Sequence, residues 1–315
     1  MEQTFAKQNP SPDGHSSRLK SFALATVVLG LCFSVPLYGL IRFAAGSELY
    51  SYILLIPFIS FYLVWHKGHH LPPAFVPARG MAVRFLAAGV VVLLAYWLVL
   101  RSRLRLVEDD YLAVMMLAFL LFFFGVCGWF FGRQFLRANA FALGFLIFLV
   151  PIPTAAIRGI DTFLQYGSAE VARGFFMITG TPFLRDGLVF QLPGITMKIA
   201  PECSGIHSSL VLFITSLLAS YFFLRTPWKR AVFIVAVIPL AILRNGFRVF
   251  TIGELCVHVG PHMINSPIHR KGGPLFFALS LIPLFLLLVV LQKSERAGGR
   301  SITKMREISN PKPPE

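Results

Sequence analysis

The stretch LAVMMLAFLLFFFGVCGWFF, residues 112–131, carries no charged side chain along its whole length. A helix of about 20 apolar residues is long enough to cross the hydrocarbon core of a bilayer. The rest of the chain has the same character, because 56% of its 315 residues are hydrophobic and only 14% are charged. In a soluble domain about a quarter of the residues would be charged. The sequence therefore predicts a membrane protein with many spans, and not a soluble domain with one anchor.

Apolar runs of similar length recur from one end of the chain to the other, and we predict an all-α polytopic membrane protein with about eight transmembrane helices. The predicted spans cover residues 22–41, 50–66, 83–100, 112–131, 138–153, 205–224, 231–252 and 274–291. The first is interpreted as a retained helix, because no clear small-residue cleavage site follows it and further spans come after it. We expect Pro57 to kink the second span.

The net charge of +15 would suggest nucleic-acid binding in a soluble protein. Here the Lys and Arg residues lie in short loops between spans, a pattern that orients membrane proteins with their basic loops in the cytoplasm. The segment 225–230 and the tail from Lys293 are the strongest indications, and the run Arg101–Arg105 opposes them. We expect both termini in the cytoplasm and no nucleic-acid partner.

The chain is expected to have three parts. Residues 1–20 and 294–315 are polar and are predicted to be disordered in the cytoplasm. Residues 21–293 form the membrane domain, and within it residues 153–204 form one long extracytoplasmic segment. This orientation places the start of the sixth span at the outer face of the membrane.

The extracytoplasmic segment changes character halfway along. Residues 154–178 have an amphipathic helical pattern and are expected to lie along the outer membrane interface. Short β-rich runs then flank a turn at Pro193–Gly194, which predicts a small extracytoplasmic β-hairpin. The hairpin leads directly to Cys203.

The sequence KIAPECSGIHSSL, residues 198–210, places an acid and a thiol at the start of the sixth span. Free backbone N–H groups and the helix dipole lower the pKa of a thiol at a helix N-terminus, which favours the thiolate. Cys203 is predicted to lie in that position. Glu202 opposes the effect, so a cation is also needed. Arg248 or a protonated His269 could supply it, since both are predicted at the same membrane face.

Position alone does not choose between the neighbouring cations. Arg248 could instead extend to the interface as a snorkelling side chain. Arg244 lies about one turn deeper beside Asn245, where a polar or protein-lined cavity is expected. Several histidines compete with His269: His207, His258 and His262.

A thiolate, a cation and a histidine together suit acyl transfer. The thiolate attacks a carbonyl, the guanidinium stabilises the oxyanion, and the imidazole carries the proton to the leaving amine. This chemistry describes a cysteine peptidase or transpeptidase. A zinc site is not indicated, because the chain has no HExxH and its cysteines lack ligand spacing. A serine protease is not indicated either, because Ser204, Ser208 and Ser209 lie in no GxSx pattern.

Three ordered motifs give the chain a resemblance to a known family. They are Cys203-Ser204-Gly205, the Asn-x-x-Arg of Asn245 to Arg248, and His269 followed by Gly272. With these motifs the chain resembles the exosortase/archaeosortase family of multi-spanning membrane transpeptidases, over about residues 50–291 and most strongly over 183–277. The resemblance covers most of the predicted membrane domain.

The resemblance implies roles that the residues alone left open. It implies Cys203 as nucleophile, Arg248 as oxyanion stabiliser and His269 as general acid and base. Glu202, Ser204, Gly205, Arg244, Asn245 and Gly272 would support them. The implied substrates are membrane-anchored proteins of the bacterial inner membrane that carry a C-terminal sorting signal. In bacterial members this signal is a Pro-Glu-Pro-like motif, a transmembrane helix and a basic cluster, as in PEP-CTERM proteins. The implied partner is an unknown envelope acceptor, with no cofactor and no metal.

Two other classes of function fit the same sequence. In a membrane transporter or channel, Arg244 and Arg248 would line a polar path, and Cys203 would be incidental. In an export scaffold, the polar residues would bind partner proteins. Loss of Cys203 separates these classes, because only the enzyme depends on the thiol.

Overall fold

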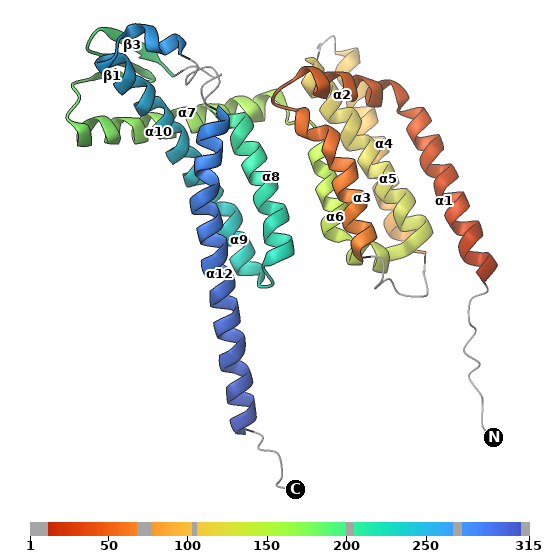
Figure 1. Cartoon of the computed structure of the whole chain (residues 1–315). Coiled ribbons are helices and arrows are strands. Elements are labelled where there is room, and N and C mark those ends of the chain that lie inside the picture. Colours follow the sequence, from red (N-terminus) through yellow and green to blue (C-terminus); the bar gives the residue numbers. More distant parts are fainter. Residues whose placement is uncertain (1–11, 68–76, 103–105, 200–204, 267–272, 310–315) are drawn as a thin grey trace, which may run out of the picture. The chain divides into compact units, whose positions relative to one another are not determined.

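The structure is a computed structural model that describes residues 12–67, 77–102, 106–199, 205–266 and 273–309, with side chains described between residues 17 and 297. The chain divides into two compact units at Ile157 and Arg158. Figure 1 draws unit 1 (residues 1–157) from red to yellow-green and unit 2 (residues 158–315) from green to blue.

Unit 1 is helical throughout its described residues. Its elements are α1 (Pro12–Cys32), α2 (Ser34–Gly46), the 3₁₀ helix η1 (Ser51–Leu55), α3 (Ile56–Lys67), α4 (Arg79–Arg101), α5 (Glu108–Ala138), α6 (Ala140–Phe145) and the 3₁₀ helix η3 (Leu146–Leu149). Helices α4 and α5 approach closely, because a β-carbon added at Gly125 would lie 2.7 Å from Leu86 Cδ2. The opposite face of α4 is exposed and apolar, as a lipid-facing surface must be.

The prediction of an all-α polytopic membrane protein is confirmed. Five helices of the described chain are long and apolar enough to cross a membrane, and the number rises to seven if each of two bent helix pairs is one span. A shorter apolar helix over Ser51–Lys67 lies where the second span was predicted. Each of the eight predicted spans therefore falls on an apolar helix or a bent pair, although fewer than eight meet the length criterion.

Prolines set the breaks in unit 1. The first predicted span is not one helix, because α1 and α2 meet at a 72° bend after Cys32. Pro36 has no N–H to donate to the Cys32 carbonyl, so the helix cannot continue through this point. The expected break near Pro57 is present as the change from η1 to α3. The fifth predicted span is also short, since α6 and η3 end before Pro151 and bend by 92° into the next helix.

Hydrogen bonds at the acidic start of α5 hold the last residues of unit 1 in place. The Tyr50 hydroxyl donates to Asp109 Oδ2 at 3.3 Å and to the Ile152 carbonyl at 3.1 Å. Asp110 Oδ1 accepts the Thr154 backbone N–H at 2.8 Å. These contacts join the start of α5 to the residues that precede and begin the next helix.

Unit 2 combines helices with one small sheet. Its elements are α7 (Thr154–Thr179), which starts just before the unit boundary, β1 (Leu184–Asp186), β2 (Val189–Leu192), β3 (Ile195–Lys198), α8 (Ile206–Phe223), α9 (Pro227–Val235), α10 (Val237–His258), the 3₁₀ helix η5 (Pro261–Asn265) and α12 (Gly273–Ser309). The helix predicted over 154–178 is confirmed as α7. Its location at a membrane interface stays a prediction.

The predicted hairpin is confirmed and has a third strand. β2 and β3 pair antiparallel with Leu192 opposite Ile195, and Gly194 takes φ +80° in the turn. The sequence analysis missed β1, which pairs antiparallel with β2 through a second tight turn. Gly187 closes that turn at φ +58°, a conformation that glycine adopts without a steric cost.

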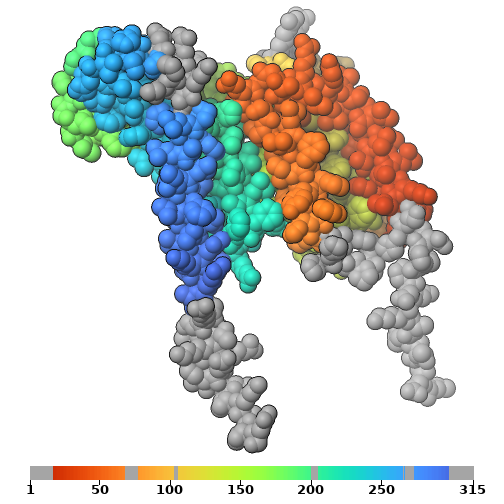
Figure 2. Space-filling view, viewed as in Figure 1, coloured from red at the N-terminus to blue at the C-terminus, as the bar shows by residue number. Residues whose placement is uncertain are grey.

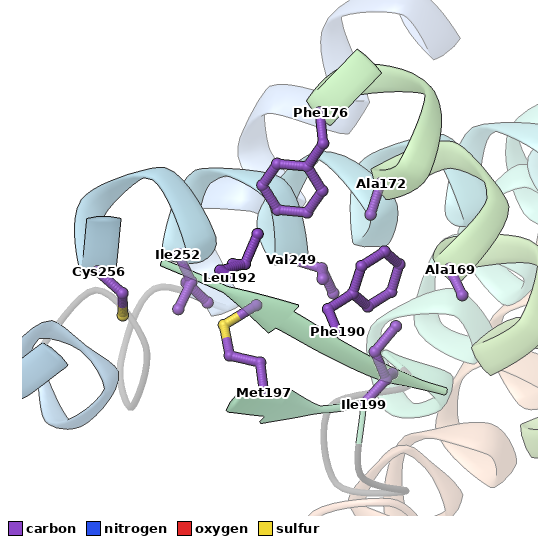
Figure 3. Close-up of a cluster of buried hydrophobic side chains, with 10 residues drawn as sticks. All are labelled: Ala169, Ala172, Phe176, Phe190, Leu192, Met197, Ile199, Val249, Ile252 and Cys256. Atoms are coloured by element: carbon purple, nitrogen blue, oxygen red, sulfur yellow. The ribbon is translucent and has the colours of Figure 1, made fainter. Parts of the chain in front are cut away.

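A buried apolar cluster packs the sheet onto α7 and α10 (Figure 3). Phe190 and Met197 form a cross-strand pair on the buried face of the sheet. Phe176 of α7 is fully buried and lies 5.7 Å from the Phe190 ring and 5.3 Å from the Phe250 ring. Alternate strand residues thus point into one core, as the period of two requires.

A second buried cluster holds the other helices of unit 2 together. Its members come from α8, α9, α10 and α12 and from the residue that follows α8: Leu212, Leu224, Phe233, Val237, Leu284 and Leu288. Figure 2 shows α12 and α8 side by side at the surface of this unit. α8 is therefore held by α12 as well as by α10.

Helices extend into both terminal segments for which disorder was predicted. α1 begins at Pro12, and α12 continues to Ser309. Once an apolar helix has formed, each added residue gains a hydrogen bond without a new nucleus. The polar residues beyond the spans can therefore continue these helices.

The apolar core under the sheet leads to a stability prediction. Phe176→Ala should lower the free energy of unfolding by about 3–5 kcal/mol, because a fully buried ring leaves a cavity. Ile178→Ala is the matched control on the same helix, since Ile178 is 82% exposed. Thermal unfolding of the detergent-solubilised protein measures both. Equal stability of the two variants would contradict this description of the core.

Candidate active site

The N-terminus of α8 is capped by a glycine in the left-handed region. Gly205 has φ +73° and ψ +18°, and its carbonyl oxygen accepts the Ser209 N–H at 2.9 Å and the Ser209 hydroxyl at 2.7 Å. A β-carbon on Gly205 would lie 2.9 Å from Arg244 Nη2. The position therefore suits glycine both for its backbone angle and for the space available.

Arg244 joins α10 to this cap. Its Nη2 donates to the Gly205 carbonyl at 3.2 Å and to Ser209 Oγ at 3.2 Å. The residue is only 7% exposed, and its Nη1 is buried without a hydrogen-bond acceptor in the described chain. A buried cation with an unused donor is costly unless a further polar group or anion approaches it. The Nη1 group of Arg244 is therefore available to a further polar group or anion, and the polar cavity expected here stays a prediction.

Asn245 joins α10 to α7 at the same level. Its Nδ2 donates to Ser168 Oγ at 3.0 Å, and both residues are almost fully buried. The next residue, Gly246, explains how the helices come so close. A β-carbon there would lie 2.5 Å from Val171 Cβ and 2.9 Å from the Ser168 carbonyl oxygen. Three helices thus meet around Arg244 and Asn245.

Of the predicted site residues, the described structure brings together Gly205, Arg244 and Asn245. Arg248 lies on α10 one turn beyond Arg244 and is half-buried. The remaining predicted residues lie outside the described part of the chain: Glu202, Cys203, Ser204, His269 and Gly272. Their roles stay predictions.

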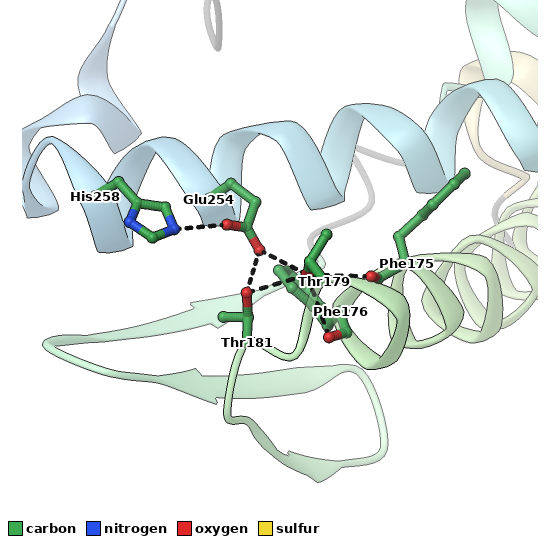
Figure 4. A network of polar contacts seen from close by, with 6 residues as sticks. All are labelled: Phe175, Phe176, Thr179, Thr181, Glu254 and His258. Carbon is green, nitrogen blue, oxygen red and sulfur yellow. Dashed lines mark hydrogen bonds and ion pairs between the residues drawn. The ribbon is translucent and has the colours of Figure 1, made fainter.

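The histidines that compete with His269 have separate positions. His258 pairs with Glu254 at 3.0 Å near the end of α10 (Figure 4). Glu254 also accepts the Thr181 hydroxyl at 2.5 Å and the Thr179 hydroxyl at 3.3 Å. Through Glu254, His258 is thus connected to the residues between α7 and the sheet. His262 is exposed on η5, and His207 is half-buried in the first turn of α8.

The sequence analysis did not single out Ser168, and it considered Ser209 only as a possible nucleophile. Both are acceptors for the motif residues of α10. A signal was present for Ser168, because it lies among the small residues Gly167, Ala169 and Ala172 at the helix spacing that permits close packing. No pattern in the sequence connected Ser209 with Arg244, which lies 35 positions away.

The described residues contain no cluster of three or more His, Cys, Asp or Glu side chains that could hold a metal ion. The three cysteines with described environments, Cys32, Cys127 and Cys256, are free thiols. Cys127 and Cys256 are buried in apolar packing, which agrees with a structural role.

These features define a multi-pass membrane protein in which Gly205, at the start of one apolar helix, meets Arg244 and Asn245 of another. The chain belongs to the transmembrane exosortase family, whose model matches residues 42–286. This membership supports a general role in the processing of sorting signals. Comparison with curated proteins found no match, and comparison with solved structures found none either.

The cap of α8 leads to a second stability prediction. Gly205→Ala should destabilise the protein by at least about 1–2 kcal/mol, because an L-residue is strained at φ +73° and its β-carbon displaces the Arg244 guanidinium. Gly174→Ala is the control, since a β-carbon there meets no atom within 4 Å and the site is helical. Chemical unfolding in detergent compares them. A Gly205→Ala protein as stable as the control would refute the cap geometry.

Proposed function

We propose that this protein is a membrane-embedded cysteine transpeptidase or peptidase with Cys203 as its nucleophile. It cleaves a C-terminal PEP-CTERM-like sorting signal from membrane-anchored exported proteins and transfers them to an envelope acceptor. One observation carries the proposal. In a chain of the exosortase family, the Gly205 carbonyl of the Cys-Ser-Gly motif accepts a hydrogen bond from Arg244, the residue just before the Asn-x-x-Arg motif. Gly205 and Arg244 are 39 positions apart in the sequence and in contact in the fold.

The proposed reaction uses ordinary acyl-transfer chemistry. The Cys203 thiolate adds to the carbonyl carbon of the scissile amide, and Arg248 stabilises the resulting oxyanion. His269 gives a proton to the leaving amine, which departs with the C-terminal helix and its basic tail. An acceptor amine or hydroxyl then loses its proton to His269 and attacks the thioester. The product carries the acceptor, and the thiolate is restored.

The described contacts support specific tasks for the neighbouring residues. Gly205 starts α8 two residues after Cys203, so the N–H groups of the first turn of α8 lie close along the chain to the thiol. Arg244 holds that turn to α10, and Asn245 holds α10 to α7. They are positioning residues, because they act through the backbone that carries Cys203. Glu202 and Ser204 flank the nucleophile, and Gly272 follows His269 after two residues.

The membrane itself helps this reaction. A substrate anchored by its own helix diffuses in two dimensions, which raises the effective concentration of its cleavage motif at the enzyme. We place the site at the extracytoplasmic face of the inner membrane, with both termini in the cytoplasm. The basic residues between α8 and α9 and in the first turn of α9, Arg225, Lys229 and Arg230, support this orientation.

The nucleophile is tested by removing the thiol. Cys203→Ala should abolish cleavage of a co-expressed substrate that ends in an apolar helix and a basic tail, because no other group can form the thioester. Cys256→Ala is the matched control, since that thiol is buried in the core under the sheet. Loss of the tail is followed by gel mobility, and mass spectrometry searches for a thioester on Cys203.

Full processing by both Cys203→Ala and Cys203→Ser would refute the enzyme. A transporter or channel remains the second candidate, because the buried guanidinium of Arg244 has an unused donor within an apolar helix. That alternative predicts that solute flux survives the loss of Cys203 and fails when Arg244 or Arg248 is replaced.

The oxyanion role of Arg248 is tested separately. Arg248→Gln should lower the cleavage rate by about 10²–10³-fold, since a preorganised charged donor would be lost from the transition state. Arg225→Gln is the control, because Arg225 lies at the other end of α8. Single-turnover cleavage with purified proteins in detergent gives both rates. Wild-type cleavage by Arg248→Gln would remove Arg248 from the mechanism and leave the thiol proposal standing.

A further inference from the structure

Unit 1 contains a large apolar cavity that the proposed reaction does not use. Its volume is about 1010 Å³, which is at the upper end of the roughly 300–1,000 Å³ typical of ligand sites. Side chains of α1, α2, α3, α5 and α6 line it, together with residues of η1 and η3. Figure 1 shows these elements within unit 1. Several of its lining side chains are exposed, among them Phe58 and Phe61, so the cavity opens to the apolar surface of the unit, where a lipid can enter.

Water is a poor occupant for this cavity. The lining is formed mainly by Phe, Leu, Ile and Val side chains, and Arg18 and Ser60 supply its polar groups among the described residues. The Ser60 hydroxyl already donates to the Ala142 carbonyl at 2.7 Å. A buried water needs two to four polar partners, and apolar cavities without them stay dry or take up apolar molecules. The lining therefore favours hydrocarbon.

The shape of the cavity favours a chain-like molecule. Along α5 the lining extends from Phe119 to Phe135. The part before the break at Gly132, from Phe119 to Phe131, is about 18 Å long at the helical rise per residue. A second protein helix would fit poorly, because helix pairs in membranes need small residues at the contact. The described lining contains neither Gly nor Ala. Flexible acyl chains can fill a cavity lined by large side chains.

One end of the cavity is cationic. Arg18 lines it one turn before Phe22, whose ring lies 4.6 Å from the Phe131 ring near the end of α5. Lys67 at the end of α3 donates to the Ala138 carbonyl at 2.6 Å, which places a third helix end at this level. Lys20 follows Arg18 on α1, whereas Arg133 and Arg137 lie after the break of α5 at Gly132 and line a different pocket.

The acidic side chains of unit 1 that the structure describes lie at the opposite end. Glu108, Asp109 and Asp110 form the first turn of α5, and Glu48 follows α2. The cationic end therefore complements a negative headgroup, while the acidic end would repel one. Each Lys or Arg near an anionic lipid surface adds roughly 1 kcal/mol of attraction.

We infer that this cavity is a binding site for an anionic glycerophospholipid, with acyl chains between α1, α3 and α5 and the phosphate beside Arg18. The inference is independent of the proposed peptidase reaction, because every residue it uses lies in unit 1. A bound lipid would fill the space between α1 and the rest of the unit. It would thereby act as a structural ligand of the fold.

The experiment uses the full-length protein purified in detergent and washed free of loosely held lipid. Native mass spectrometry measures binding of palmitoyl-oleoyl phosphatidylglycerol and of the zwitterionic phosphatidylcholine with the same chains. We expect one tightly held phosphatidylglycerol per chain, and weaker binding of phosphatidylcholine. Equal binding of the two lipids, or the absence of a retained lipid, would overturn the inference.

Two pairs of variants locate the site. Val64→Trp fills the cavity from α3 and should lower retention of phosphatidylglycerol at least about ten-fold, whereas Val91→Trp on the exposed face of α4 should leave it unchanged. Arg18→Gln should lower the preference for phosphatidylglycerol about five-fold. Arg84→Gln is its control, since Arg84 is an exposed cation of α4 that does not line the cavity.

A third variant tests the site even if Val64→Trp does not fold. Ile41 lines the cavity but is 56% exposed, so Ile41→Trp narrows the site without adding volume to the core. Circular dichroism and size-exclusion chromatography confirm that each variant is folded. If folded Ile41→Trp and Val91→Trp proteins retain phosphatidylglycerol equally, the lipid binds elsewhere and the inference is wrong. Selective loss in Ile41→Trp supports it.

Discussion

The close crossing of α7 and α10 at Gly246 is the contact on which the candidate site depends. Only a hydrogen atom fits at this position, because Val171 and the Ser168 backbone occupy the space of a β-carbon. The crossing places Asn245 within hydrogen-bond distance of Ser168 and Arg244 beside the cap of α8. In an apolar environment these polar groups find few water molecules, so protein partners must satisfy them.

The same two helices also hold the sheet. Phe176 of α7 and Val249 of α10 pack against the buried face that includes Phe190, and Glu254 binds the threonines at the end of α7. The chain is therefore anchored on both sides of residues 200–204. On one side Ile199 donates its N–H to the Leu188 carbonyl at 2.9 Å and is buried. On the other side, Gly205 is hydrogen-bonded to Arg244. The proposed nucleophile belongs to this short connection between two anchored points.

Much of the fold was predictable because it depends on local sequence. Continuous apolar runs predicted the spans, the amphipathic pattern predicted α7, and Pro193–Gly194 predicted the turn between β2 and β3. The errors of detail arose where a local signal was weak. The bend after Cys32 depends on Pro36, which appeared to be one apolar position in a longer run. β1 is only three residues long and gains its strand identity from pairing with β2.

The candidate site was predictable only in part. The motif resemblance selected Arg248 and His269, and the depth of Arg244 beside Asn245 indicated a polar cavity. The hydrogen-bond partners of Arg244 and Asn245 could not be predicted, because they come from other helices. The contact of Asn245 with Ser168 depends on how closely α7 and α10 cross, which is set by side-chain volume at Gly246 and Val171 together. Neither Gly246 nor Val171 indicates in the sequence that the two residues will meet.

The sequence by itself determined that this protein lies in a membrane, where its spans run and in which order its motifs occur, because hydrophobic length and backbone chemistry act within each segment. Only the tertiary structure decided that the Gly205 carbonyl meets Arg244 and that Ser168 meets Asn245. It alone revealed an apolar cavity with a cationic end between helices of unit 1. These features arise from packing between segments distant in sequence, and packing depends on the shapes of both surfaces at once.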